Sequence, residues 1–150
     1  MKNCFFIGHR EASTEIFPAL MAAVEQHIEA YGVTEFFVGN YGGFDHLAAR
    51  TVIAAKERHP EINLSLLIPY HPAERPIEPP PGFDNTFYPP GMEKVPRRLA
   101  IVRANRYMVD HVDYLIAYAW HPASNARDLL EYAQKREQRN LISVTVLTRS

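Results

Sequence analysis

The fold is decided by the stretch Asn3-Cys4-Phe5-Phe6-Ile7-Gly8-His9-Arg10. Its apolar run predicts a buried β-strand over 3–7, which ends at Gly8 and is followed at once by polar residues. The same order returns in Glu35-Phe36-Phe37-Val38-Gly39-Asn40. Strands that end in glycine and a polar loop, each followed by an amphipathic segment, are typical of α/β folds.

The rest of the chain continues this alternation. Apolar runs predict further strands over 62–68, 112–119 and 141–147, and helical spacing of apolar residues predicts helices at 17–31, 44–59, 97–111 and 125–139. Strands that alternate with helices form right-handed βαβ units and a parallel sheet that is covered on both faces. We therefore predict a Rossmann-like three-layer α/β sandwich, with a five-stranded parallel sheet in the order 3-2-1-4-5.

The length of 150 residues fits a single domain, 1–150. Within it, the segment 69–96 holds nine of the twelve prolines, and this spacing predicts a loop without regular elements. Long loops in compact domains are often functional, so we expect a lid or an interface. Its aromatic residues favour packing on its own domain. The alternative is a protein-interaction module that presents polyproline II segments to a partner.

The charge balance restricts the partners. The chain has 16 Lys and Arg against 17 Asp and Glu, a formal net charge of −1, so we expect no nucleic-acid partner. Twelve of the cations are Arg and four are Lys. Because Arg holds planar anions through two parallel hydrogen bonds, this excess favours one small anionic ligand held in a pocket.

The compartment is expected to be the cytoplasm. The single cysteine, Cys4, lies in an apolar run and is predicted to be a core residue rather than a disulfide partner. The sequence contains neither a signal peptide nor an apolar run of transmembrane length. We expect no membrane partner.

Ligands of open parallel sheets bind at the carboxyl ends of the strands, at the point where the strand order reverses. The candidate binding residues follow the predicted strands. They are Gly8, His9 and Arg10 after the first, Gly42, Gly43 and Asp45 after the second, His71 after the third, and His121, Ser124, Asn125 and Arg127 after the fourth.

Each candidate has a structural and a functional interpretation. Gly42-Gly43 before a helix makes either a tight turn or an anion site of exposed backbone N–H groups. Asp45 either complements the helix dipole or accepts ribose hydroxyls. Ser124-Asn125 either caps a helix or binds phosphate. Arg127 in the first helical turn opposes the dipole, which a bound anion would offset.

Four histidines follow predicted strands, but their spacing matches no zinc signature. We therefore predict no metal site and no required cofactor. His9 and His121 are expected beside the ligand as polar groups. The four residues are His9, His46, His71 and His121.

Three blocks in this order resemble the SLOG superfamily, and in particular its YpsA-like (DUF1273-like) branch. They are Gly8-His9-Arg10, the block from Gly42 to Ala48, and Asn105-Arg106-Tyr107-Met108-Val109-Asp110. The resemblance spans nearly the whole chain. It implies a Rossmann-like fold that binds a nucleotide or a nucleotide-derived ligand, and a homo-oligomer.

The superfamily includes the DNA-uptake protein DprA and the LOG phosphoribohydrolases, which cleave the base from nucleoside 5′-monophosphates. The LOG motif Pro-Gly-Gly-x-Gly-Thr-x-x-Glu corresponds here to 120–128, where the glycines are absent. Asp128 falls near the place of the catalytic glutamate, and Arg103 and Arg106 are loose counterparts of the basic pair before the strand. The alternative to a binding protein is therefore an N-glycosidase with Asp128 or Asp45 as the catalytic carboxylate.

Overall fold

A parallel sheet of six strands runs through the chain, in the order β4-β3-β2-β1-β5-β6. The computed structural model describes residues 1–148. Each pair of neighbouring strands is parallel. The strands are β1 (Lys2–Gly8), β2 (Val33–Val38), β3 (Asn63–Leu67), β4 (Asn85–Phe87), β5 (Tyr114–Tyr118) and β6 (Ser143–Val146).

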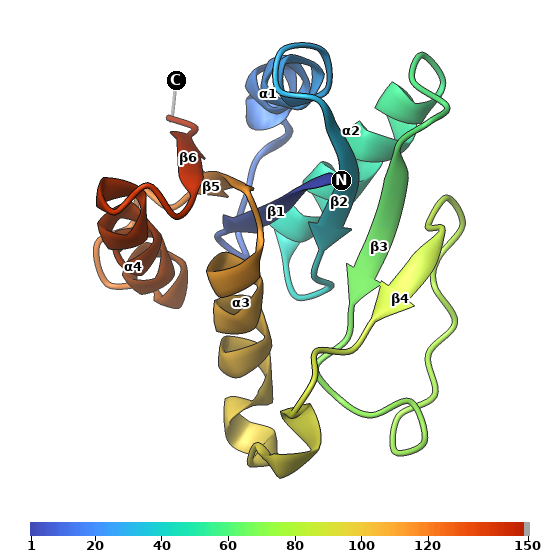
Figure 1. Cartoon of the computed structure of the whole chain (residues 1–150), viewed down its shortest axis with the longest axis vertical. Helices are drawn as coiled ribbons and strands as arrows, with labels where there is room; N and C mark the ends of the chain where they lie inside the picture. Colours follow the sequence, from blue (N-terminus) through green and yellow to red (C-terminus); the bar gives the residue numbers. More distant parts are fainter. Residues whose placement is uncertain (149–150) are drawn as a thin grey trace.

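Helices cover both faces of the sheet (Figure 1). On one face lie α1 (Phe17–Glu29) and α2 (Gly43–Lys56), and on the other lie α3 (Ala100–His111) and α4 (Asn125–Gln138). Short 3₁₀ turns precede α1 and α3 and interrupt the proline-rich segment, at Thr14–Ile16, Arg97–Leu99 and Met92–Lys94. The predicted α/β class is confirmed.

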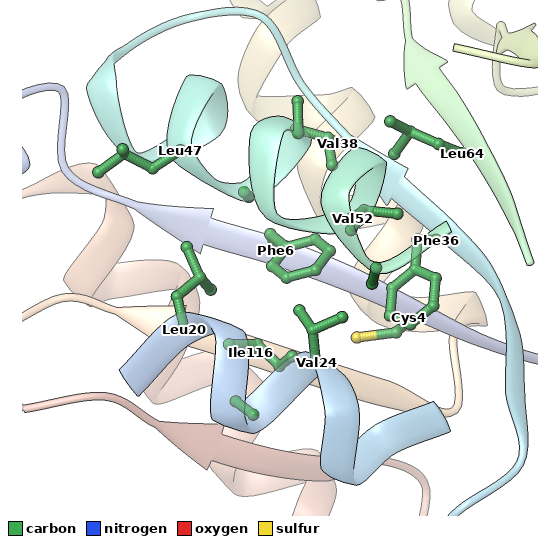
Figure 2. Packing of buried hydrophobic residues seen from close by; sticks show 14 of the residues in the cluster. Cys4, Phe6, Leu20, Val24, Phe36, Val38, Leu47, Val52, Leu64 and Ile116 are labelled. Carbon is green, nitrogen blue, oxygen red and sulfur yellow. The ribbon is translucent and has the colours of Figure 1, made fainter. Parts of the chain in front are cut away.

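The two-residue period of the strands divides the core into two halves. In β1, Cys4 and Phe6 face α1 and α2, whereas Phe5 and Ile7 face α3 and α4. Figure 2 shows the first half, where Phe6 lies among side chains from β2, α1 and α2. Cys4 is completely buried there, as predicted.

The predicted count of five strands is wrong, and the order differs by one added edge strand. β4 pairs with β3 from Ser65↔Asn85 to Leu67↔Phe87. It escapes prediction because its three residues contain no apolar run and lie between two proline clusters. The proline-rich segment is thus partly regular, and its neighbour Asp84 is anchored by Lys56 Nζ at 2.6 Å.

No helix within residues 1–148 is both long enough and apolar enough to span a lipid bilayer.

Candidate functional site

A cleft of about 810 Å³ opens at the carboxyl ends of β1 and β5. The chain continues from β1 to β2 on one side and reaches β5 on the other, so this is the point where the strand order reverses. Many residues predicted from the strand ends line it. They are Gly8, His9, Arg10, Asp45, Arg106, His121, Ser124, Asn125 and Asp128.

The glycines after β1 and β2 serve close packing. A Cβ at Gly8 would lie 2.3 Å from Cγ of the buried Phe44. Gly43 donates its N–H to the Arg10 carbonyl at 2.7 Å, and a Cβ at Gly42 would lie 2.7 Å from Arg10 Cα. Gly42 and Gly43 are outside the cleft lining. Their role in this geometry is to hold the backbone of Arg10 at the cleft.

His9 ties the end of β1 to the loop after β5. Its Nε2 accepts the N–H of His121 at 2.9 Å, and its ring lies edge-on to Trp120 at 5.1 Å. Burial, and then the nearby His121, lower the pKa of His9 below 6.5. Since only an unprotonated Nε2 accepts a hydrogen bond, the lowered pKa keeps this contact intact at neutral pH.

The loop between β5 and α4 is held by its own polar side chains. Ser124 Oγ accepts the N–H of Arg127 at 3.1 Å and donates to the His121 carbonyl at 3.0 Å. Ser124 is therefore the N-cap of α4. The exposed Asn125 and Asp128 follow it on the cleft side.

Asp45 is a half-buried carboxyl in the first turn of α2. Its Oδ2 accepts the N–H of Tyr41 at 3.1 Å. Burial raises the pKa of Asp45 from 3.8 to about 6, against the smaller lowering effects of the Tyr41 N–H and His46. This carboxyl therefore exchanges a proton close to neutral pH, and perturbed groups of this kind often mark functional clefts.

Two of the four predicted arginines line the cleft and two do not. Arg10 and Arg106 line the cleft. Arg103 lies in a neighbouring cavity. Arg127 turns away from the cleft, because its guanidinium group contacts the Ala119 carbonyl at 3.4 Å and Glu131 at 3.7 Å.

His71 is also outside the cleft. Its Nδ1 accepts the N–H of Ala73 at 3.0 Å, and its ring lies 5.4 Å from that of Tyr88. No residue of 69–96 is among those that line the cleft. In this structure the proline-rich segment therefore contributes no wall to it.

Several cleft residues escape the sequence prediction. Arg98 lies in the 3₁₀ turn that precedes α3. The pattern that predicts Arg127, a cation at the start of a helix, also applies to Arg98. Tyr132 could be found by helical spacing, since it follows Asn125 and Asp128 at i+7 and i+4. The remaining additions include Glu11, Tyr41, Ile101, Val102, Asn105, Trp120 and Leu129.

Aromatic rings stand beside the arginines. The Arg106 guanidinium lies 4.2 Å from the centroid of the Tyr132 ring, in a cation–π contact. Tyr41 is 37% exposed, which leaves part of its surface open to a ligand, and Trp120 also lines the cleft. Arg10, Arg98 and Arg106 form no ion pair with any carboxylate in residues 1–148. The cleft thus combines open cationic groups with aromatic surfaces.

A cluster of side chains of the kind that can bind a metal ion lies outside the cleft. In residues 1–148, ligand atoms of Glu25, Glu29 and His59 lie within 4.8 Å of one another. Arg58 pairs with Glu25 in the same place, and His59 Nε2 is 2.7 Å from Glu25. The cluster joins the carboxyl ends of α1 and α2, at the opposite edge of the sheet from the cleft. It acts there as an ion-pair network between the two helices.

The sequence matches no protein-family model and no curated protein.

Proposed function

We propose that this chain binds a nucleotide or a nucleotide-derived ligand in the cleft at the ends of β1 and β5. One observation carries the proposal: Arg10, Arg98 and Arg106 converge on the cleft, and none of them has a carboxylate partner within residues 1–148. Guanidinium groups that a protein leaves unpaired in a concave site are suited to a phosphate, which they hold through parallel hydrogen bonds.

The other lining groups suit the remaining parts of a nucleotide. The carboxylates of Glu11, Asp45 and Asp128 are acceptors for ribose hydroxyls, as acidic residues are in other dinucleotide-binding folds. The exposed surface of Tyr41 offers stacking for a base. The position of the cleft and the three ordered sequence blocks support a SLOG-type domain, which we propose as its family.

Calorimetric titration with nucleoside 5′-monophosphates, nucleotide sugars and dinucleotides tests this function. We expect saturable binding by the wild type, and about tenfold weaker binding by Arg98→Ala, which loses one charge-assisted hydrogen bond. Arg50→Ala is the matched control, because Arg50 is exposed on α2 and outside the cleft. Absence of binding for the whole panel, or equal affinities for the two variants, contradicts the proposal.

An N-glycosidase is the second candidate. The observation that favours it is that Asp45, with a pKa of about 6, and Asp128 line the same cleft. A carboxyl that is still partly protonated near neutral pH can donate a proton to a leaving base, while a second carboxylate stabilises the oxocarbenium-like transition state. The assay is release of free base from AMP, CMP, GMP and IMP. Activity that survives unchanged in both Asp45→Asn and Asp128→Asn excludes this mechanism.

We also propose a cytoplasmic homo-oligomer. The exposed apolar side chains of Leu141 and Val146, both 44% accessible and outside the cleft lining, offer surface to a second copy. Light scattering coupled to gel filtration measures the mass directly. A monomeric mass at every concentration contradicts self-association.

A further inference from the structure

A second cavity lies beside the cleft, with a volume of about 490 Å³. It is formed by α3 and by the end of the proline-rich segment, from Pro90 to Val95. Met92 in its wall is buried, and Val95 and Tyr107 are half-buried. The cavity therefore has an apolar wall of its own and is separate from the strand ends.

The charge of this cavity is positive. Arg103 and Arg106 line it, both are exposed, and neither forms an ion pair with a carboxylate in residues 1–148. The acidic group in the lining, Asp110, is already engaged: Arg136 lies 3.5 Å from its Oδ1, which also accepts the hydroxyl of Tyr132. The two guanidinium groups are thus left without a carboxylate partner in residues 1–148, and Arg106 keeps its cation–π contact with Tyr132.

Helix geometry places Arg106 between the two cavities. Arg103, Arg106, Tyr107 and Asp110 follow the i, i+3, i+4, i+7 spacing of one helical face. The adjacent face of α3 lines the cleft with Ile101, Val102 and Asn105. Arg106 belongs to both linings. One ligand can therefore contact Arg106 from the cleft and continue toward Arg103.

We propose that the cavity around Arg103 is a second anion subsite, so that the ligand carries two anionic groups, as a small dinucleotide does. This inference rests on the proposed function of the cleft, which receives the first nucleotide. Arg106 then contacts the ligand where it passes from the cleft, and Arg103 holds the second phosphate. The apolar wall formed by Met92, Val95 and Tyr107 receives the second nucleoside.

The test compares nucleoside 5′-monophosphates with the corresponding 5′-phosphorylated dinucleotides, by calorimetry in 0.15 M salt, where long-range attraction is screened. For the wild type we expect the best dinucleotide to bind about tenfold more tightly than its mononucleotide. Arg103→Ala should remove this tenfold gain and leave the mononucleotide affinity unchanged. Arg106→Ala should weaken the binding of both ligands, and Arg50→Ala should change the binding of neither.

The outcomes separate the two proposals. If mononucleotides bind but dinucleotides gain nothing, or if Arg103→Ala leaves the gain intact, the second subsite is wrong and the proposed function stands. If no probe binds the wild type, both fall. Because Arg103 is exposed, its variant should unfold at the same urea concentration as the wild type. If the urea midpoint of Arg103→Ala is shifted, the loss of the dinucleotide's extra affinity could come from a change in folding. In that case the subsite stands only if Arg103→Lys restores part of the extra affinity.

Discussion

Asp45 is a half-buried carboxyl at the cleft, and its burial makes the ionised form less stable in the folded chain. Its pKa is about 6 in the folded chain and 3.8 in the unfolded reference, and burial is the main cause. Between these values the folded state binds more protons than the unfolded state. The stability contributed by this group therefore falls as the pH rises from about 4 to about 6.

Asp45→Asn should remove this loss of folding stability at neutral and higher pH. The amide oxygen still accepts the Tyr41 N–H, and no charge has to be desolvated. We expect the variant to gain about 1–2 kcal/mol over the wild type at pH 8, with partial solvent access reducing the full linkage value, and no gain at pH 4. Urea unfolding at both pH values measures it, with Asp128→Asn as the control for loss of a cleft carboxylate. A destabilised Asp45→Asn at pH 8 contradicts this interpretation.

His27 has the opposite pH dependence. It is completely buried, its Nδ1 donates to the Ala23 carbonyl at 2.7 Å, and its Nε2 has no hydrogen-bond partner among residues 1–148. Burial lowers its pKa below 6.5. The unfolded state thus binds the proton more tightly, so stability that is present above pH 6.5 is lost as the pH falls.

His27→Phe should reduce this acid sensitivity, leaving the part due to His9, while it keeps an aromatic ring against Tyr31 and Tyr114. At pH 8 we expect a change within about 1 kcal/mol, because one hydrogen bond is lost and an unsatisfied ring nitrogen is removed. His111 makes the same contact, with the Tyr107 carbonyl at 2.7 Å, but is exposed. His111→Phe is therefore the control for replacing such a histidine with phenylalanine. An unchanged loss in His27→Phe would exclude His27 as its source.

Among the elements, β1 and α2 pack against each other at Gly8 and Phe44. We expect Gly8→Ala to cost about 1–3 kcal/mol, since Phe44 is fully buried and a Cβ would lie 2.3 Å from its ring. Phe44→Leu in the same chain should recover part of that loss. Equilibrium unfolding of the two single variants and the double variant measures the coupling. Strictly additive losses would show that the two residues do not clash.

The proline-rich segment consists of an open part and an anchored part. Every side chain from 71 to 80 is exposed. By contrast, Asp84 accepts the N–H of Leu64 at 2.8 Å and forms an ion pair with Lys56. We expect limited proteolysis of the wild type within 71–81, and cleavage that extends into 82–88 in Asp84→Ala. Glu78→Ala in the open part is the control. Early wild-type cleavage within 83–95 contradicts the anchoring and favours an exposed interaction arm.

These elements show how far the sequence predicts the molecule. Long apolar runs such as that of β1 are recognisable because both faces of the strand are buried. β4 is not, because an exposed edge strand of three residues needs no apolar pattern. Loops directly after strands bring Arg10 and His121 to the cleft. On α3, Arg103 and Arg106 share one face but stand about 60° and about 4.5 Å apart, so Arg106 lines the cleft and Arg103 lines only the neighbouring cavity.

For the whole molecule, the net charge of −1 conceals an uneven distribution. Arg58, Arg97, Arg127 and Arg136 form ion pairs with carboxylates outside the cleft lining. Within the described part of the chain, residues 1–148, the cleft arginines form no such pair. A neutral chain can therefore hold one small anion strongly while it lacks the broad positive surface that a polyanion requires.

A two-dimensional NMR titration of the ¹⁵N-labelled chain with nucleoside 5′-monophosphates places the ligand on the fold residue by residue. We expect saturating amide shifts at 8–11, 98–106 and 120–129, the segments that surround the cleft. The same titration of Arg98→Ala should need about tenfold more ligand to reach the same shifts. Spectra that stay unchanged with every nucleotide, or shifts confined to the Glu25–His59 network at the opposite edge, contradict nucleotide binding in this cleft.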